Sequence, residues 1–471
     1  MTLFQFPLEA ARWMLLASII LAAWLYGGTR PWTRELISWL LIANSAVFLL
    51  GLVLRFRLPR IPAIPAAAMG FLLLQGWFMA WNAKKQFVEF AGVFVHRDPP
   101  LPGWPGFVDQ GMVIPSLILV TGLLGSFAIA CDMAANRIWR DRLWITIAGT
   151  GTSIVILGLA QRLTEAPSIF WDLENNLGTT FFAVFRYHAN AGAFINLVLP
   201  LTVGLAIRSF QRENENADRV LWTLAALVSA AAAFINVSRA ANILSAALVL
   251  CFAVWFITAR RSRKNSTSRK SLLLAGLAGL AAIVVLTFSF GLEQTVARWN
   301  QGVLKQIAPE SGRVQAYRII VEESLPATGA LGFGPGTFEK VFDTHRSKST
   351  IPLQGRYDFA HSDALQTVME WGWAGSAAWF ALLGGGLMVC ARNLLFHRSK
   401  EVGVLAGACG LSLAGVMIHA CVDFPLQIAS IQLVSICTAA MAWSLHSPKI
   451  SGSRLEDALE NPRYRVIMKE K

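Results

Sequence analysis

Polar residues that could do chemistry gather in four short stretches, three beside long apolar runs and one within the polar segment 291–371. The first carries Arg186 and Asn190 at the mouth of one run, and the second places Ser238 and Arg239 between two runs with almost no loop. Charged and polar groups beside a bilayer are costly, so they are the first candidates for function. An Arg in this setting suits an anionic ligand. The plain structural alternatives are snorkelling of the Arg to lipid headgroups and capping of a helix by the Asn.

The third stretch opens with Arg313, continues past Arg318 and leads into a glycine-rich segment, 326–338. Its glycines resemble those of a phosphate-binding loop, but no Lys-Ser/Thr pair follows them and no parallel sheet is expected before them. Tight turns that let two backbones approach closely explain the glycines better. This stretch therefore predicts close packing and not a nucleotide site.

The fourth stretch, 359–375, contains His361, Asp363 and Glu370 where a polar segment meets an apolar one. A neutral imidazole can take a proton from a hydroxyl group, which makes His361 a candidate general base. A histidine capped by its neighbours at a membrane interface is the structural alternative. The sequence has no nucleophile elbow for a serine triad and no metal-ligand spacing, so we predict no metal site.

His419 and Asp423 form a further polar pair, spaced i, i+4 near the end of another apolar run. A local hydrogen bond between them that fixes the turn is the interpretation we prefer. The six cysteines all lie within or at the ends of apolar runs and form no CxxC pair. We expect them to be small buried residues without disulfides.

The composition of the chain indicates that membrane-spanning helices position these residues. Of 471 residues, 55% are hydrophobic and 15% are charged, whereas a soluble domain carries about 25% charged residues. A membrane-crossing helix needs about 20 apolar residues, which predicts about twelve spans and an all-α polytopic membrane protein. The predicted spans are 12–28, 36–54, 63–81, 113–131, 143–160, 190–207, 220–237, 240–258, 272–290, 372–391, 402–421 and 427–445.

Lys and Arg concentrate in alternate connections if both termini are cytoplasmic, as the positive-inside rule requires. The net charge of +13 then faces lipid headgroups, so we expect membrane lipids and no nucleic acid as partners. No convincing cleavage site follows the first run, which we expect to be retained. The expected divisions are spans one to nine in 1–290, a large periplasmic loop in 291–371, three more spans in 372–446 and a basic cytoplasmic tail in 447–471.

In this order the four stretches resemble the O-antigen ligase and O-antigen polymerase family of bacterial envelope glycosyltransferases (Wzy-C type), over roughly residues 175–445. Two departures are the Ser at 362, where Asn is commoner, and one extra residue before the glycines. The matching residues are Asn190 and Pro200, Ser238-Arg239, Arg313, the glycine stretch that begins at Pro326, His361-Ser362-Asp363-Ala364-Leu365-Gln366, and the motif from Glu370 to Gly375.

The resemblance implies a GT-C-like fold in the bacterial inner membrane with a site that faces the periplasm. It implies transfer of a glycan from an undecaprenyl-diphosphate donor to lipid A-core, a polysaccharide or a protein, by a metal-independent, inverting reaction that uses no cofactor. His361 would be the general base, and Arg239 and Arg313 would clamp the diphosphate with help from Arg186. Supporting residues would be Asn190, Ser238, Arg318, Asp363 and Glu370.

Several alternatives stay open on sequence alone. Within the family, an O-antigen ligase of lipopolysaccharide biosynthesis is slightly favoured by the spacing of the large-loop motifs. A polymerase of O-antigen or exopolysaccharide and a protein O-oligosaccharyltransferase need the same donor site. A polysaccharide or lipid transporter or flippase is the rival from another class, and it predicts paired repeats and charges near the bilayer centre. A scaffold without catalysis would leave the Arg and His residues without a purpose.

Overall fold

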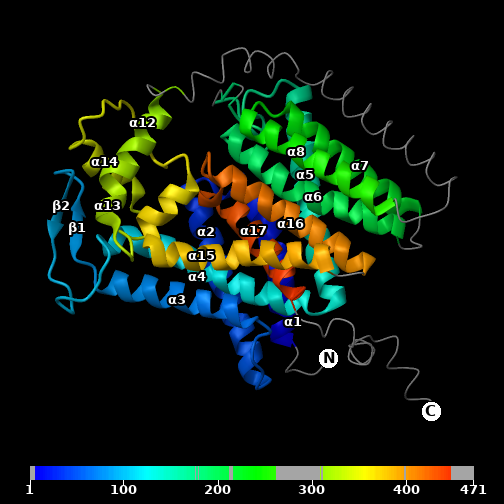
Figure 1. The fold of residues 1–471 in the computed structure, drawn as a ribbon, viewed down its shortest axis with the longest axis horizontal. Helices are drawn as coiled ribbons and strands as arrows, with labels where there is room; N and C mark the ends of the chain where they lie inside the picture. Colours follow the sequence, from blue (N-terminus) through cyan, green and yellow to red (C-terminus); the bar gives the residue numbers. More distant parts are fainter. Residues whose placement is uncertain are drawn as a thin grey trace.

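The computed structural model describes residues 6–174, 177–178, 180–211, 216–260, 308, 311–396 and 399–446, with no account of the side chains of 253–260. This part of the chain is mostly helical, and nine of its helices are long and apolar enough to cross a membrane. The long helices lie side by side, and the short elements of the connections gather at one end (Figure 1). This end is called the loop end below. The architecture is that of a polytopic helical membrane protein.

The described helices coincide with eleven of the predicted spans. The ninth predicted span, 272–290, lies outside the described residues, so the count of twelve stays a prediction. The nine long helices are α1 (Phe6–Trp24), α2 (Pro31–Leu54), α3 (Ala63–Trp81), α4 (Gln110–Ala134), α5 (Arg137–Leu163), α6 (His188–Gln211), α7 (Asn216–Ile235), α15 (Asp363–Phe396) and α16 (Lys400–Ala420). Two helices with shorter apolar stretches, α8 (Arg239–Arg260) and α17 (Ala429–Ser444), complete the set.

Helix α6 is the most enclosed of the nine long helices, and small residues let its neighbours come close. A Cβ added at Gly192 would overlap the methyl group of Ala241 on α8, and one at Gly204 would meet Ala408 on α16. Membrane helices associate through such small residues because close backbone approach maximises van der Waals contact. The start of α6, which carries Asn190 of the first stretch, is therefore held in a fixed place at the loop end.

The connection 82–112 adds one small β element to this helical fold. It contains a hairpin of two antiparallel strands, β1 (Lys85–Val88) and β2 (Val93–His96), in which Phe87 is paired with Phe94. Their rings meet at 5.0 Å, a favourable cross-strand aromatic pair. The Asp109 carboxylate accepts the Phe87 amide at 2.6 Å and caps α4 through the Met112 amide at 2.8 Å.

The described part of the large connection has its own small core. It contains α12 (Gly312–Ile319), a π-helical turn η4 (Ile320–Ser324), α13 (Leu325–Thr328) and α14 (Phe338–Arg346). Buried residues of these elements pack against the start of α15, which begins before the predicted span. The core consists of Ala316, Ile319, Ile320, Phe338, Val341, Phe342, Ala360 and Met369.

Candidate functional site

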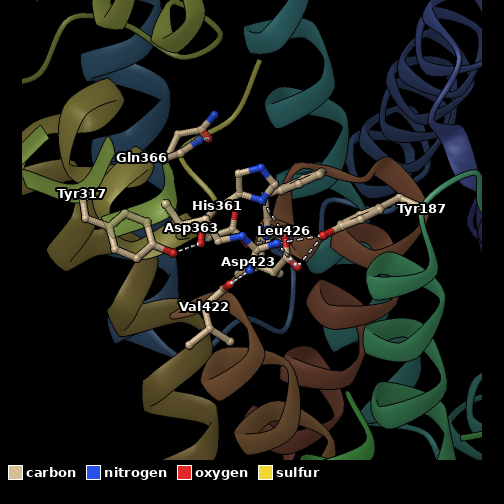
Figure 2. Close-up of polar contacts among 11 residues, drawn as sticks. Tyr187, Tyr317, His361, Asp363, Gln366, Val422, Asp423 and Leu426 are labelled. Carbon is tan, nitrogen blue, oxygen red and sulfur yellow. Dashed lines mark hydrogen bonds and ion pairs between the residues drawn. The ribbon is translucent and has the colours of Figure 1, made fainter. Parts of the chain in front are cut away.

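His361 stands between the large connection and the first turn of α15. Its φ is 52°, in the left-handed region that few residues other than glycine adopt, although histidine enters it more often than most. The Tyr317 hydroxyl on α12 donates a hydrogen bond to the His361 carbonyl (Figure 2). The backbone of His361 is thus fixed by Tyr317, while its side chain is 27% exposed and accessible to a ligand.

Asp423 orients the His361 ring. His361 Nδ1 lies 3.2 Å from Asp423 Oδ1, and the Asp423 side chain is only 5% exposed. The second ring nitrogen points away from the carboxylate (Figure 2). A buried carboxylate favours the tautomer with hydrogen on Nδ1, which leaves a lone pair on Nε2. The geometry therefore suits a base that removes a proton at Nε2 while Asp423 stabilises the imidazolium.

Two further side chains complete the surroundings of Asp423. Arg313 Nη2 donates to the Tyr187 hydroxyl at 3.0 Å, and that hydroxyl donates to Asp423 Oδ2 at 3.2 Å. Arg313 Nη2 also lies 3.7 Å from Asp423 Oδ2. Burial opposes the charge on Asp423, but the His361 hydrogen bond and the Arg313 charge outweigh it, so the pKa of Asp423 lies below its usual value. The carboxylate is charged at neutral pH.

The pKa values of Tyr187, Tyr317 and Arg313 determine which of these groups are protonated at neutral pH. Burial, with the charge of Asp423, raises the pKa of the Tyr187 hydroxyl far above its usual value. Burial likewise raises the pKa of Tyr317 to about 12. Burial alone would lower the pKa of Arg313, but Tyr187 and Asp423 raise it above the usual value. Both tyrosines are therefore neutral donors, and the guanidinium is charged.

An aromatic wall supports the ring of His361. Phe424 stacks on Tyr187 at 5.5 Å and on Phe359 at 4.4 Å, and His361 meets its edge at 5.1 Å. Edge-to-face and offset contacts of this kind are the preferred aromatic geometries. Residue 424 follows Asp423 directly, so one turn supplies both the carboxylate and the wall.

Asp363 positions this turn and does not touch the His361 ring. Its carboxylate accepts the Leu426 amide at 2.7 Å and the Gln427 side-chain amide at 2.9 Å. Its own amide donates to the Asp423 carbonyl at 3.1 Å. Asp363 thus ties the start of α15 to the turn that carries Asp423, which gives the predicted supporting residue a concrete role.

The glycine-rich stretch packs against a kink in α15, as close backbone approach predicted. Gly372 interrupts the helix with a φ of 67°, and a Cβ there would overlap the Ala330 carbonyl. The amide of Gly334 donates to the Glu370 carbonyl at 2.8 Å. The Glu370 side chain accepts from Gln366 at 3.1 Å. The third and fourth sequence stretches therefore form one structural unit, and Glu370 belongs to that unit.

The first and second stretches meet beside Tyr187. The Asn236 side-chain amide, in the turn between α7 and α8, donates to the His188 carbonyl at 2.8 Å. Ser238 and Asn190 are buried, whereas Arg239, the first residue of α8, is partly exposed. Asn190 lies within the first turn of α6 and is not its cap. The hairpin with Arg239 is thus fixed to the segment that delivers Tyr187 to Asp423.

Arg186 and Arg318 stand apart from the network. Arg186 is exposed, one residue before Tyr187. Arg318 forms an exposed pair with Glu322 at 3.2 Å, one turn along the helical segment. The guanidinium of Arg318 is thus directed to a surface carboxylate, and its supporting role stays a prediction.

The expected pairing of His419 with Asp423 is wrong at the side-chain level. Both ring nitrogens of His419 are buried without a hydrogen-bond partner in the described residues. The turn is closed by the backbone, since the Asp423 amide donates to the His419 carbonyl at 3.0 Å. The Asp423 carboxylate binds residues distant in sequence instead. Sequence spacing favoured the near histidine, and only the fold brings His361 closer.

Sequence reasoning passed over Asp423, Tyr187 and Tyr317 as site residues. Two weak signals existed: Tyr187 lies next to a selected Arg, and Tyr317 lies between Arg313 and Arg318. The six cysteines are not paired with one another. Within the described residues, no group of three or more His, Cys, Asp and Glu could hold a metal ion.

No protein-family model and no curated protein sequence matches this chain. The resemblance to the O-antigen ligase and polymerase family therefore stays a prediction.

Proposed function

We propose that this protein is a glycosyltransferase of the bacterial inner membrane that moves a glycan from an undecaprenyl-diphosphate donor to an acceptor hydroxyl in the periplasm. The observation that supports it best is the network of His361, Asp423, Tyr187 and Arg313 at the loop end. It joins an oriented base to a charged guanidinium, and residues from three of the four sequence stretches contribute to it.

In the proposed reaction, His361 Nε2 removes the proton of the acceptor hydroxyl as its oxygen attacks the anomeric carbon. The bond from that carbon to the diphosphate oxygen breaks, and undecaprenyl diphosphate leaves with the electron pair. Attack on the face opposite the leaving group inverts the anomeric centre. Asp423 stabilises the imidazolium that forms, and a base of this kind contributes about 10²–10⁴-fold.

Arg313 is the proposed link between the base and the diphosphate. Its side chain is 33% exposed, and its guanidinium donates hydrogen bonds to the Tyr187 hydroxyl and the Val422 carbonyl. A guanidinium has five N–H donors, so donors are left for phosphate oxygens. Arg239 and Arg186 are proposed as further diphosphate contacts, because arginine binds phosphate in bidentate fashion.

The direct test is glycan transfer by the purified protein, with an undecaprenyl-diphosphate oligosaccharide and no added nucleotide or metal. Lipid A-core, a second donor molecule and an acceptor protein are offered in parallel. Transfer to lipid A-core would establish a ligase, lengthening of the donor glycan a polymerase, and protein modification an oligosaccharyltransferase. No transfer to any acceptor by folded protein would contradict the proposal and favour a transporter.

A further inference from the structure

A cavity lies among α2, α4, α15 and α17, beside the turn that carries Asp423. It encloses about 100 Å³, within about 750 Å³ of empty space that includes its open mouth. All four helices begin at the loop end, so position along each helix gives the depth of a lining residue. Polar side chains of its lining include Arg34, Ser116, Glu370 and Gln432.

A basic and an acidic side chain, Arg34 and Glu370, line the end of the cavity near the loops. Arg34, in the first turn of α2, donates to the Ser116 hydroxyl at 3.2 Å. Glu370 is 5% exposed and accepts from Gln366 and from backbone amides of the glycine stretch. In the described part of the chain no ion pair of 4.0 Å or less joins the two. A carboxylate has about four acceptor sites, so Glu370 can also meet a ligand.

Two polar atoms of α17 also line this cavity without partners. Gln432 Oε1 and Ser435 Oγ are buried and make no hydrogen bond in the described residues, and Ser435 is 1% exposed. A serine inside a membrane helix commonly bonds the carbonyl four residues earlier. Buried polar groups without partners call for an explanation, such as a ligand or an ordered water molecule.

The deeper part of the cavity is apolar. Its walls come from side chains further along α4 and α15, namely Leu123 and Leu383, with the Trp379 ring beside them. A polar end near the membrane surface and an apolar end toward the bilayer centre match the orientation of a lipid in the leaflet at the loop end.

We propose that this cavity binds the headgroup and the start of one acyl chain of a zwitterionic phospholipid, with its phosphate on Arg34 and its ammonium on Glu370. Charge complementarity selects this class. A diphosphate would place two or more negative charges on one guanidinium beside a carboxylate, and an anionic lipid without an ammonium would leave Glu370 uncompensated. The inference rests on the membrane architecture and does not depend on glycosyl transfer.

The test uses purified protein in detergent, incubated with an equal mixture of phosphatidylethanolamine and phosphatidylglycerol that carry the same acyl chains. Retained lipid is counted by native mass spectrometry after size-exclusion chromatography. We expect wild type to retain phosphatidylethanolamine in preference. Arg34→Gln should lower this retention about tenfold, or ~1.4 kcal/mol, and Glu370→Gln should abolish the preference.

A pair of enlarged side chains separates binding from folding. Val120→Phe fills the cavity and should prevent retention, whereas Leu50→Phe, on the exposed side of α2 at 52% exposure, should leave it unchanged. Thermal unfolding and elution volume show that each variant is folded, and Ser435→Leu replaces Val120→Phe if the latter is not. Equal retention of both lipids by wild type, no retained lipid, or unchanged retention by the folded cavity-filling variant would each overturn the proposal.

Discussion

At the scale of single residues, the site depends on one carboxylate with several partners. Asp423 accepts from His361 and Tyr187 and attracts Arg313, so the base and the cation share one anchor. The sequence singled out His361 and Arg313 for the proposed site, and the structure places both beside Asp423. It did not identify Asp423 as their anchor, because a turn of helix made His419 the obvious partner.

The lowered pKa of Asp423 predicts how this anchor affects stability. A carboxyl group whose pKa is lower in the folded than in the unfolded state stabilises the fold above its unfolded pKa, which is about 3.9. That stabilisation is lost as pH falls through the folded-state value. Asp423→Asn should therefore lower the thermal midpoint at pH 8 and at pH 5, and the difference from wild type should shrink below pH 4. A difference that grows with acid would contradict this linkage.

Arg313 is expected to need its planar fork and not only its charge. Arg313→Lys cannot donate at once to Tyr187, to the Val422 carbonyl and to a phosphate, so transfer should fall by about 10-fold to 100-fold. Arg318→Lys, on the same helix but in an exposed pair with Glu322, is the matched control and should keep its activity. Initial rates at saturating donor check both, and equal activity of the two variants would remove Arg313 from the site.

Arg239 is the second arginine proposed to bind the diphosphate. Arg239→Ala should abolish transfer without loss of expression, and Arg239→Lys should also be severely impaired because lysine lacks the bidentate fork. Assays of glycan transfer at matched protein amounts decide this. A fully active Lys variant would point to simple charge, or to snorkelling toward lipid headgroups.

At the scale of elements, the glycine-rich stretch 326–338 and the stretch 359–375 pack against each other and form one contact, called the joint below. The glycine-rich stretch was expected to allow close approach, but its partner was not apparent from the sequence. The partner is the kink of α15 at Gly372, where Ala374 donates to the Ala330 carbonyl at 3.0 Å. The pairing joins segments about forty residues apart, and no local pattern specifies such a contact.

This joint predicts different costs for two glycines of the same stretch. Gly329 and Gly332 both have positive φ, but a Cβ at Gly332 would overlap the backbone of Glu370, whereas a Cβ at Gly329 meets nothing within 4 Å. Gly329 has φ 67° and ψ −165°, a conformation essentially restricted to glycine, so Gly329→Ala should cost about 1–3 kcal/mol of backbone strain. Gly332→Ala should cost more and reduce transfer as well. Thermal unfolding in detergent compares them, and equal midpoints would contradict the joint.

At the scale of the whole molecule, hydrophobic runs predicted the positions of eleven described helices, since a run of about 20 apolar residues has few other solutions. The hairpin β1–β2 was not predicted, because its strands are only four residues long. The packing partners of the helices could not be predicted either. Close packing at small residues such as Gly192 and Gly204 depends on the shapes of both helix surfaces, which the sequence of one helix does not specify.

The charge bias also predicts which side of the membrane the loop end faces. Single cysteines at Gly92, in the exposed hairpin turn, and at Phe56, in the exposed α2–α3 connection, are introduced into a variant without the six native cysteines. An impermeant maleimide applied to intact cells whose outer membrane is permeabilised should label position 92 and spare position 56. The reverse pattern would place the proposed site on the cytoplasmic side and contradict the periplasmic reaction.

The most direct test of the central claim is the rate of glycan transfer by wild type, His361→Ala, Asp423→Ala and the double variant, each purified and shown to be folded. If Asp423 acts by orienting the base, each single change should lower the rate by on the order of 10²–10⁴, and the double variant should lose no more than His361→Ala alone, since residues that act as a unit are not additive. Wild-type transfer by His361→Ala, or losses that simply multiply in the double variant, would contradict the account.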